Sequence, residues 1–310
     1  MVFMERNVRL MQLLREFCLE HHIAVLWGVP MADYTSFRIG GRADALLFPS
    51  TEAQLASLLL FLAREDAPYR VIGNATNLLV SDEGFRGALV TTRHIRSVSV
   101  SGSTARAACG TPINSFCRTL AEFSLSGAEA LYGIPGTVGG AILMNAGAFD
   151  HTVSDRLSYV SVFDMREGKT AVIPKKDCGF SYRHSLFTEQ KHLIVLSADF
   201  ELRPAPCGVI REKMKETLAK RMEKQPTALP SAGSTFLRPE GHYAGRLIEE
   251  AGLVGARIGG AAVSVKHAGF IVNLGGATAK DVLDLISYVQ VTVFEKCGVT
   301  LTTEIEYIGP

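Results

Sequence analysis

The segment 132–149 reads YGIPGTVGGAILMNAGAF, and it is rich in glycine and carries no charged side chain. Glycine accepts a positive φ and lets the main chain come close to a ligand. A run of exposed backbone N–H groups can hold a phosphate without help from a cation. The segment therefore predicts a cradle for a pyrophosphate beside a flat apolar ring. A tight turn between two packed elements explains the same composition, and the segment alone leaves both interpretations open.

A second short loop, GNATN at 73–77, follows a predicted strand and could bring backbone amides to the same phosphate ligand. The chain contains neither GxGxxG nor GxxxxGK followed by serine or threonine, so neither a Rossmann fingerprint nor a P-loop is expected. The segment 132–149 also lacks lysine, which argues against hydrolysis of a nucleoside triphosphate.

Three side chains farther along the chain have the chemistry to act on a substrate. Arg183 lies in SYRHSLF, Ser234 in PSAGSTF, and Glu304 in LTTEIEYIG. A guanidinium fork suits a carboxylate or an enolate, although an ordinary surface ion pair uses the same residue. The Ser234 hydroxyl, among small neighbours, could act as a nucleophile, donate a proton to an enolate or cap a turn; no GxSxG elbow surrounds it. Glu304 could serve as acid, base or orienting group, or form a solvent-facing pair with Glu306.

The bulk composition limits the class of protein. The 310 residues carry a net charge of +1, with 47% hydrophobic and 20% charged residues, which is typical of a soluble globular enzyme of two or three domains. This balance favours neither a nucleic-acid nor a membrane partner. The longest apolar run, 56–63, is too short to cross a bilayer, and the first residues lack a signal sequence, so we expect a cytoplasmic protein. Cysteine and histidine spacings match no metal site, and we expect none.

Hydrophobic periodicity and turn residues place these motifs on elements. In the first half we expect a helix over 5–22, a turn at Gly40 and Gly41 leading into a strand that ends at Pro49, and a helix capped by Ser50 or Thr51. Strands follow over 69–72 and 78–80, with further short strands between 88 and 110. Thr111 is expected to cap the next helix, with Pro112 at its first position.

The second half is predicted to be β-rich over 156–202, followed by a linker at 203–207 (RPAPC). A charged helix should then run to Lys224 and bury a stripe made of Ile210, Met214, Leu218 and Met222. A capping box at Thr278 and a glycine stop at Gly298 predict a long helix between them. A last strand over 299–308 would place Glu304 and Glu306 on one face.

Taken in chain order, the motifs resemble the UDP-N-acetylenolpyruvoylglucosamine reductases, the FAD-dependent MurB family of bacterial cell-wall synthesis. The resemblance covers nearly the whole chain. Its motifs are TSFRIGG (35–41), IGNATNLLVSDEGFRG (72–87), GIPGTVGGAILMNAGAF (133–149), SYRHSLF (181–187), KQP with PSAGSTF (224–236), VSVKHAGFIVN (263–273) and LTTEIEYIG (301–309).

The resemblance implies an α+β protein of three parts. Residues 1–90 and 91–203 would form the two subdomains of an FAD-binding fold of the vanillyl-alcohol oxidase or PCMH type, and residues 204–310 an α+β substrate-binding domain. The implied reaction is a two-electron reduction. NADPH would give hydride to noncovalently bound FAD, the reduced flavin would give hydride to C3 of the enolpyruvyl ether of UDP-N-acetylglucosamine enolpyruvate, and C2 would be protonated, yielding UDP-N-acetylmuramate.

The resemblance also assigns roles to residues. It implies that Arg183 holds the substrate carboxylate, that Ser234 donates the proton to C2, and that Glu304 stabilises or protonates the enolic intermediate. Lys224, Arg238 and His267 would join Arg183 and Ser234 in binding substrate. The implied cofactor contacts are Tyr34, Thr35, Arg38, Gly73, Asn74, Ala75, Thr76, Asn77, Leu78, Ile134, Pro135, Gly136, Thr137, Gly139, Gly140, Ala141, Asn145, Ala146, Gly147 and Ala148.

The chain departs from the family pattern in two places. The loop that usually reads GxGSN is GNATN, with Ala75 and Thr76, and alanine suits such a loop only if no positive φ is needed. The short spacing between Arg183 and Lys224 indicates the shorter family type, without the insertion that carries a substrate-binding tyrosine. We expect a monomer whose partners are the nucleotide-sugar substrate and NADPH. Another FAD-linked oxidase or dehydrogenase and a noncatalytic nucleotide-sugar binding protein are the alternatives.

Overall fold

The structure is a computed structural model that describes residues 2–309, with side chains from residue 9 onward. The chain divides into two compact units. Unit 1 runs up to Trp27 and also takes Asp44–Asn74 and Gly87–Thr217; unit 2 takes Gly28–Ala43, Ala75–Arg86 and the chain from Leu218 onward. Two segments near the amino terminus therefore belong with the carboxy-terminal part. The division into three parts at residues 90 and 203 remains a prediction.

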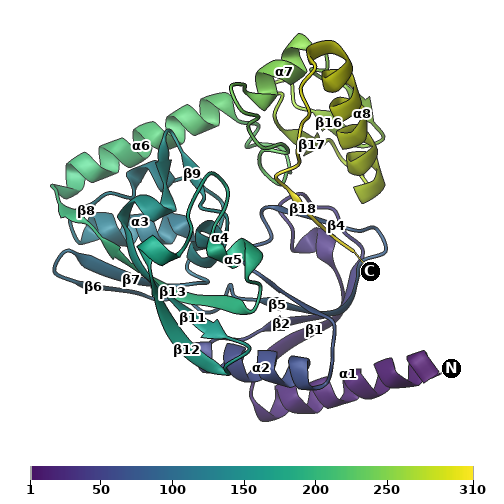
Figure 1. Cartoon of the computed structure of the whole chain (residues 1–310), viewed down its shortest axis with the longest axis vertical. Helices are drawn as coiled ribbons and strands as arrows, with labels where there is room; N and C mark the ends of the chain where they lie inside the picture. Colours follow the sequence, from purple (N-terminus) through teal and green to yellow (C-terminus); the bar gives the residue numbers. More distant parts are fainter. Residues whose placement is uncertain (1, 310) are drawn as a thin grey trace. The chain divides into compact units, whose positions relative to one another are not determined.

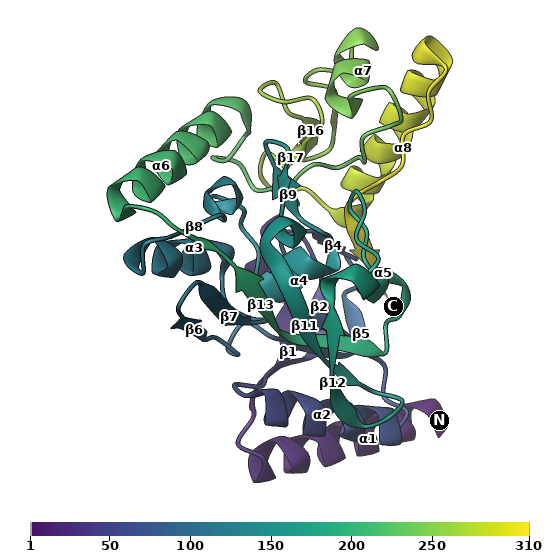
Figure 2. The ribbon, with the colours of Figure 1, turned by 60° about the vertical axis from the view of Figure 1, so that its left-hand side comes forward.

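A four-stranded sheet with order β1-β2-β5-β3 begins the fold, and its β3 and β5 strands are parallel. Helices α1 and α2 lie side by side beside it (Figures 1 and 2), and Phe17 stacks on Phe61 with 4.3 Å between ring centroids. Thr51 caps α2 by accepting from Gln54 N, which confirms one of the two expected caps. The bounds are α1 Val2–Glu20, β1 Ala24–Pro30, β2 Arg42–Phe48, α2 Glu52–Arg64, β3 Tyr69–Ile72 and β5 Phe85–Thr91.

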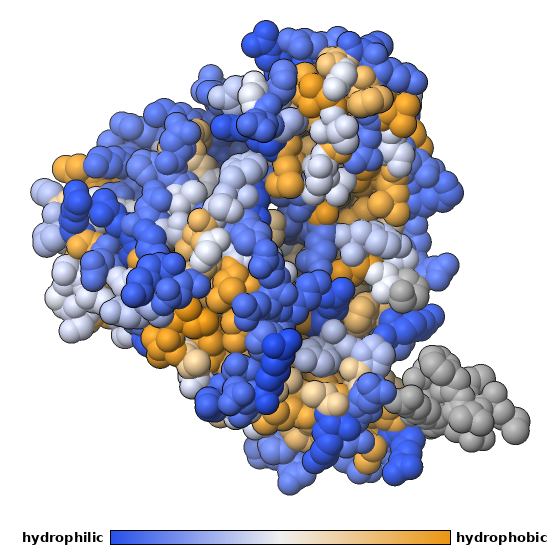
Figure 3. All heavy atoms as spheres, in the orientation of Figure 1, coloured by the Kyte–Doolittle hydropathy of each residue, from blue (hydrophilic) through white to orange (hydrophobic). Residues whose placement is uncertain are grey.

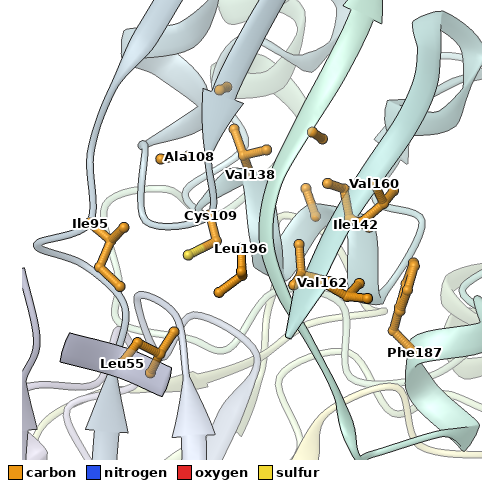
Figure 4. Close-up of a cluster of buried hydrophobic side chains, with 14 of the residues drawn as sticks. Leu55, Ile95, Ala108, Cys109, Val138, Ile142, Val160, Val162, Phe187 and Leu196 are labelled. Atoms are coloured by element: carbon orange, nitrogen blue, oxygen red, sulfur yellow. The ribbon is translucent and has the colours of Figure 1, made fainter. Parts of the chain in front are cut away.

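Unit 1 also contains a five-stranded antiparallel sheet with order β12-β11-β13-β7-β6. Helices α3 and α4 pack on it, and the rings of Phe116 and Phe200 lie 4.8 Å apart. Figure 4 shows Val138 and Ile142 of α4 beside Val160 and Val162 of the sheet in this core. The bounds are β6 Val98–Ser101, β7 Thr104–Ala108, α3 Ile113–Glu122, α4 Val138–Leu143, β11 Leu157–Asp164, β12 Lys169–Pro174, α5 Leu186–Glu189 and β13 Leu193–Glu201.

Short elements complete unit 1, and they correct the expected linker at 203–207. Arg203–Pro204 forms strand β14, which pairs with β8, so this segment is part of the folded unit. The remaining short elements of the chain are β8 Leu125–Ser126, β9 Gly147–Ala148, β10 His151–Thr152, and the 3₁₀ turns Met31–Asp33, Glu129–Leu131, Val153–Arg156 and Lys175–Asp177.

Unit 2 is built on a three-stranded antiparallel sheet, β15-β16-β17, and on helices α7 and α8. Its core includes Phe37, Ile39 and Leu79 from the amino-terminal half of the chain, so those residues stabilise the carboxy-terminal part. Strand β4 pairs in parallel with β18. The bounds are β4 Leu78–Val80, α7 Ala244–Glu250, β15 Arg257–Ile258, β16 Ala261–Val263, β17 Ile271–Asn273, α8 Ala279–Cys297 and β18 Glu306–Ile308.

Helix α8 confirms the expected capping box. Thr278 accepts from Asp281 N while the Asp281 carboxylate accepts from Thr278 N, and Gly298 ends the helix with φ of 67°. Asp82 adds two more acceptors, for Ala279 N at 2.8 Å and Lys280 N at 3.0 Å. Asp82, in the motif segment 72–87, therefore stabilises the start of α8 by accepting from N–H groups that have no partner within the helix.

The helix expected to end at Lys224 is α6, Cys207–Lys224, and one of its predicted core residues is wrong. Ile210 and Met214 are buried, but Met222 is 54% exposed and Arg221 is buried instead. At about 100° per residue, position 221 lies about 20° from position 210 around the helix, whereas position 222 lies about 120° away. Figure 3 shows mostly hydrophilic side chains over α6, as the expected solvated face requires.

Two further expectations at element ends are wrong. Helix α3 starts at Ile113, and Pro112 is its N-cap residue. The Thr111 hydroxyl does not cap the helix, because it donates to Ser97 O and accepts from Ser97 N. The last strand covers only Glu306–Ile308, so Glu304 lies outside it and does not share a strand face with Glu306.

Among residues 2–309, no helix is both long enough and apolar enough to cross a lipid bilayer.

The GNATN loop (73–77) takes a conformation that the sequence did not reveal. Ala75 is 4% exposed and has φ of 51°, in the left-handed region where a side chain is disfavoured. The loop therefore does require a positive φ at position 75, which is the conformation that alanine was expected to adopt poorly. The neighbouring segments hold Ala75 in this conformation, and the Ala75 carbonyl accepts from Ser36 N at 3.3 Å.

We expect Ala75→Gly to change the free energy of unfolding by less than about 1 kcal/mol, because relief of the left-handed strain is offset by a lost methyl and a more flexible unfolded chain. Ala75→Val should destabilise by about 2–4 kcal/mol, since a β-branched side chain fits neither the backbone nor the buried site. Urea unfolding of the cofactor-free protein measures both. Equal stability of the two variants would contradict the left-handed conformation.

Candidate active site

The glycine-rich segment (132–149) is not a simple loop, because it contains helix α4. Thr137 caps this helix by accepting from Gly140 N at 3.3 Å. The main chain on both sides of the cap, residues 136–139, pairs with the segment 109–113, and a Cβ on Gly139 would lie 2.9 Å from the Cβ of Cys109. Gly139 is therefore required for close packing rather than for flexibility. Composition alone did not reveal the helix, because glycine is a poor helix former.

The GNATN loop and the glycine-rich segment meet at one point within unit 1. A Cβ on Gly73 would lie 2.7 Å from Thr137 Oγ1, so only glycine allows this approach. The Gly73 carbonyl accepts from Thr91 Oγ1 at 2.9 Å, which fixes the start of the loop. The two segments that the sequence predicts to hold one ligand thus touch where the main chain is bare.

Arg183 lies at the tip of a tight turn. Ser181 and His184 exchange backbone hydrogen bonds with N···O distances of 3.1 and 3.3 Å, and Arg183 has φ of 54°. The Arg183 guanidinium lies 5.3 Å from the ring centre of Tyr182. A non-glycine residue in the left-handed region persists only where its surroundings hold it, and such residues cluster at functional sites.

The Arg183 turn, defined as residues 181–185, is held by three hydrogen bonds to the glycine-rich segment. They are Asn145 Nδ2 to Ser181 O at 2.9 Å, Ser185 Oγ to Leu143 O at 2.7 Å, and Arg183 Nη2 to Gly147 O at 3.4 Å. Ser185 is 0% exposed, so its hydroxyl makes this bond away from competing water. The expected cofactor segment and the expected catalytic arginine are therefore one connected structure.

The other polar atom of the Asn145 side chain, Oδ1, lacks a hydrogen-bond partner in the described part of the protein. The side chain is buried, at 5% exposed. Buried side-chain acceptors in folded proteins are normally paired. An unpaired one beside a predicted ligand cradle suits an N–H or O–H donor from a bound molecule.

Ser234 and Glu304 lie in unit 2, and Thr235 connects them. Glu304 N donates to Thr235 O at 2.8 Å, while Thr235 N donates to Gly269 O at 2.8 Å. The Thr235 hydroxyl accepts from Ile271 N at 3.0 Å, and Thr235 is 1% exposed. The main chain that carries both predicted catalytic side chains is therefore fixed by buried hydrogen bonds. Both Ser234 and Glu304 are half-buried.

Residues 34–38 and 75–78, which contain the amino-terminal members of the expected cofactor set, belong to unit 2, and hydrogen bonds join them to the same segments. Ser36 Oγ donates to Ser231 O at 2.7 Å, and Asn77 Nδ2 donates to Glu304 O at 3.1 Å. Arg38 has φ of 54°, and its carbonyl accepts from Asn273 Nδ2 at 3.4 Å. Within this unit, the segments expected to bind cofactor thus position the segments that carry Ser234 and Glu304.

The residues expected to bind substrate have different surroundings. Lys224 is exposed at the end of α6, and the guanidinium of Arg238 lies 4.4 Å from the ring centre of Tyr243. Burial lowers the pKa of His267, and its Nδ1 accepts from Gly269 N at 3.1 Å. His267 is therefore neutral at neutral pH, with its remaining ring N–H on Nε2.

Unit 1 thus holds residues 73–74, the glycine-rich segment and Arg183, whereas unit 2 holds 34–38, 75–78, Ser234, Glu304 and the expected substrate residues. The roles assigned to all of these residues remain predictions. Sequence reasoning missed Ser36, Ser185, Thr235 and Asn273. Their bonds join segments far apart in the chain, and no local pattern announces such a partner.

Known proteins and protein families are similar to this chain over most of its length. Residues 43–173 match an FAD binding domain, and residues 225–308 match the C-terminal domain of UDP-N-acetylenolpyruvoylglucosamine reductase. The enzyme of that name from Caldanaerobacter subterraneus subsp. tengcongensis is 46% identical over 280 residues, which cover 90% of this chain and 92% of the relative. The one from Caldicellulosiruptor saccharolyticus is 44% identical over 290 residues, 93% of each chain.

A solved structure agrees with these relatives. The UDP-N-acetylenolpyruvylglucosamine reductase (MurB) of Thermus caldophilus superposes with a TM-score of 0.78 at 36% identity, covering 92% of this chain and 98% of its own. The expected α+β fold, an FAD-binding part followed by a MurB-type carboxy-terminal part, is thereby confirmed. With identity above 40% over about nine-tenths of its length, the chain belongs to the UDP-N-acetylenolpyruvoylglucosamine reductase family, a family of FAD-binding oxidoreductases.

Proposed function

We propose that this protein catalyses the NADPH-dependent, FAD-mediated reduction of UDP-N-acetylglucosamine enolpyruvate to UDP-N-acetylmuramate, as a UDP-N-acetylmuramate dehydrogenase of peptidoglycan precursor synthesis. The observation that carries the proposal is the bonding of the strained Arg183 turn to the glycine-rich segment. It joins the side chain proposed to bind the substrate carboxylate to the segment proposed to hold the cofactor. We also retain the cytoplasm as the expected compartment and a monomer as the expected state.

The residues of the cradle fit a bound FAD. A side chain at Gly73 would collide with Thr137, so glycine at this position lets the two segments proposed to hold the pyrophosphate pack against each other. The unpaired Asn145 Oδ1 suits an N–H or O–H donor, which a flavin with its ribityl chain provides. When bound, FAD supplies a two-electron carrier that accepts hydride from NADPH and delivers it to the substrate.

Arg183 would stabilise charge on the substrate. Addition of hydride to an enol ether next to a carboxylate moves electron density onto that carboxylate. A guanidinium already held in place strengthens its hydrogen bonds as this charge develops, which is where electrostatic catalysis is most effective. The bonds of Ser185 and Asn145 fix the backbone that carries Arg183, and its Nη2 donates to Gly147 O at 3.4 Å.

Ser234 would donate the proton to C2, and Glu304 would stabilise or protonate the enolic intermediate. A serine hydroxyl is a weak acid, so the proposal requires a strongly basic carbon and a well-fixed donor. The bonds of Thr235 to Gly269, Ile271 and Glu304 support the second requirement. Lys224, Arg238 and the neutral His267 are proposed to contact the nucleotide sugar, with the first two supplying positive charge for its phosphates.

The direct test is an assay of the purified protein with bound FAD. We expect the visible absorption of flavin, and oxidation of NADPH that requires UDP-N-acetylglucosamine enolpyruvate and yields UDP-N-acetylmuramate. A protein that neither contains FAD nor binds added FAD would contradict the proposal. Oxidation of NADPH at the same rate without the nucleotide sugar would instead identify a general flavin oxidoreductase.

The role of Ser234 is tested by separating the two half-reactions in rapid mixing. Ser234→Ala should leave reduction of the flavin by NADPH nearly unchanged and slow its reoxidation by substrate on the order of 10²- to 10³-fold, as for loss of a group that acts in the transition state. Ser231→Ala is the matched control in the same loop, because it keeps the carbonyl that Ser36 uses. Equal slowing of both half-reactions by Ser234→Ala would show that Ser234 is not the proton donor.

A further inference from the structure

The Asn145 amide has one end committed to the Arg183 turn. Its Nδ2 donates to Ser181 O at 2.9 Å, and because a carbonyl can only accept, this bond fixes which end of the amide is nitrogen. The Oδ1 must then point away from that carbonyl. Although the side chain is buried, this Oδ1 has no hydrogen-bond partner among residues 9–309, whose side chains the structure describes.

The position of Asn145 limits what could pair with Oδ1. The residue directly follows Met144, the C-cap of α4, and its own N–H donates to Ile142 O at 3.2 Å. It therefore lies inside the glycine-rich segment, where the proposed function places FAD. The pyrophosphate of FAD has no hydrogen to donate at neutral pH. The donors of FAD are the N3–H of the isoalloxazine ring, the ribityl hydroxyls, the adenine amino group and the hydroxyls of the adenosine ribose. Of these, the ring and the ribityl chain form the part of FAD that must lie near the substrate, and Asn145 is bonded to the turn that carries the proposed substrate ligand Arg183.

We propose that Asn145 couples cofactor binding to the position of Arg183: its Oδ1 accepts a hydrogen bond from the flavin or ribityl part of FAD, while its Nδ2 holds the Arg183 turn. The inference rests on the proposed function. It goes further by naming one side chain that serves both the cofactor and the residue that binds the substrate carboxylate. Asn145 is then a cofactor ligand and, toward Arg183, a positioning residue.

A plainer account is that asparagine stands at 145 only for its backbone. Asn145 has φ of 41°, and asparagine tolerates the left-handed region better than most residues. Glycine tolerates it as well, so Asn145→Gly removes both amide interactions without adding backbone strain. The backbone account predicts that this variant behaves like the wild type.

Ser185 provides a matched control. Its hydroxyl forms another tether of the Arg183 turn, to Leu143 O, and Ser185→Ala removes that tether while leaving the Asn145 amide in place. Comparing the two variants separates loosening of the turn, which both cause, from loss of the proposed acceptor for FAD, which only Asn145→Gly causes.

The experiment measures the Kd of FAD for the cofactor-free full chain by quenching of flavin fluorescence, and then the KM for UDP-N-acetylglucosamine enolpyruvate at saturating FAD. Asn145→Gly should raise the Kd for FAD about tenfold, as expected for one lost hydrogen bond in a buried site. Ser185→Ala should leave that Kd within about twofold of wild type. Both variants should raise the substrate KM, because both release the Arg183 turn. Circular dichroism confirms that each variant is folded.

Each of the other possible outcomes would overturn one part of this proposal. A wild-type Kd for FAD in Asn145→Gly removes the cofactor contact, and an equal rise in Ser185→Ala attributes the loss to the loosened turn instead. An unchanged KM in Asn145→Gly removes the coupling to Arg183. Wild-type protein that binds no FAD would contradict the proposed function itself. The measurement of the Kd for FAD detects this outcome without any catalytic turnover.

A cofactor analogue separates the two kinds of donor on the flavin side of FAD, the ring N3–H and the ribityl hydroxyls. FAD methylated at N3 lacks the ring N–H. If the ring is the donor, this analogue binds the wild type about tenfold more weakly than FAD does, and Asn145→Gly binds the two equally. If a ribityl hydroxyl is the donor, methylation weakens both proteins by the same factor.

Discussion

The structure of the proposed site depends on the hydrogen bonds between the Arg183 turn and the glycine-rich segment. Arg183 has φ of 54°, and an unsupported chain would leave that conformation. The buried Ser185 hydroxyl and the Asn145 amide hold the turn from both sides of its tip. On the proposed function, these bonds lower the cost of ordering the Arg183 backbone when substrate binds.

Unit 2 repeats the same design with other residues. The Ser36 hydroxyl holds the loop that leads to Ser234, and the Asn77 amide holds the carbonyl of Glu304. In both units, a segment expected to bind FAD makes side-chain hydrogen bonds to the main chain of a segment expected to act on substrate. On the proposed function, these hydrogen bonds link cofactor binding to the placement of the catalytic groups within each unit.

Local signals in the sequence predicted the elements whose cause is local. The capping box at Thr278 and the glycine at 298 correctly bounded α8, since those interactions lie within a few residues. Expected caps and strand bounds were wrong where contacts with segments elsewhere along the chain determine the local structure. Thr111 is engaged by Ser97 and so does not cap α3, and the chain around Glu304 pairs with the segment carrying Phe236 before it bends into β18. The family resemblance named Asn145 as a cofactor contact, but its bond to Ser181 O joins residues 36 positions apart and could not be predicted from a local pattern.

We expect the glycine-rich segment and the Arg183 turn to respond to FAD as one structure. Amide hydrogen exchange of the wild-type full chain, with and without FAD, measures this response. Binding of FAD should slow exchange in peptides covering 132–149 and, to a comparable degree, in peptides covering 179–187. Slower exchange confined to 132–149, with the turn exchanging as in the cofactor-free protein, would contradict the account.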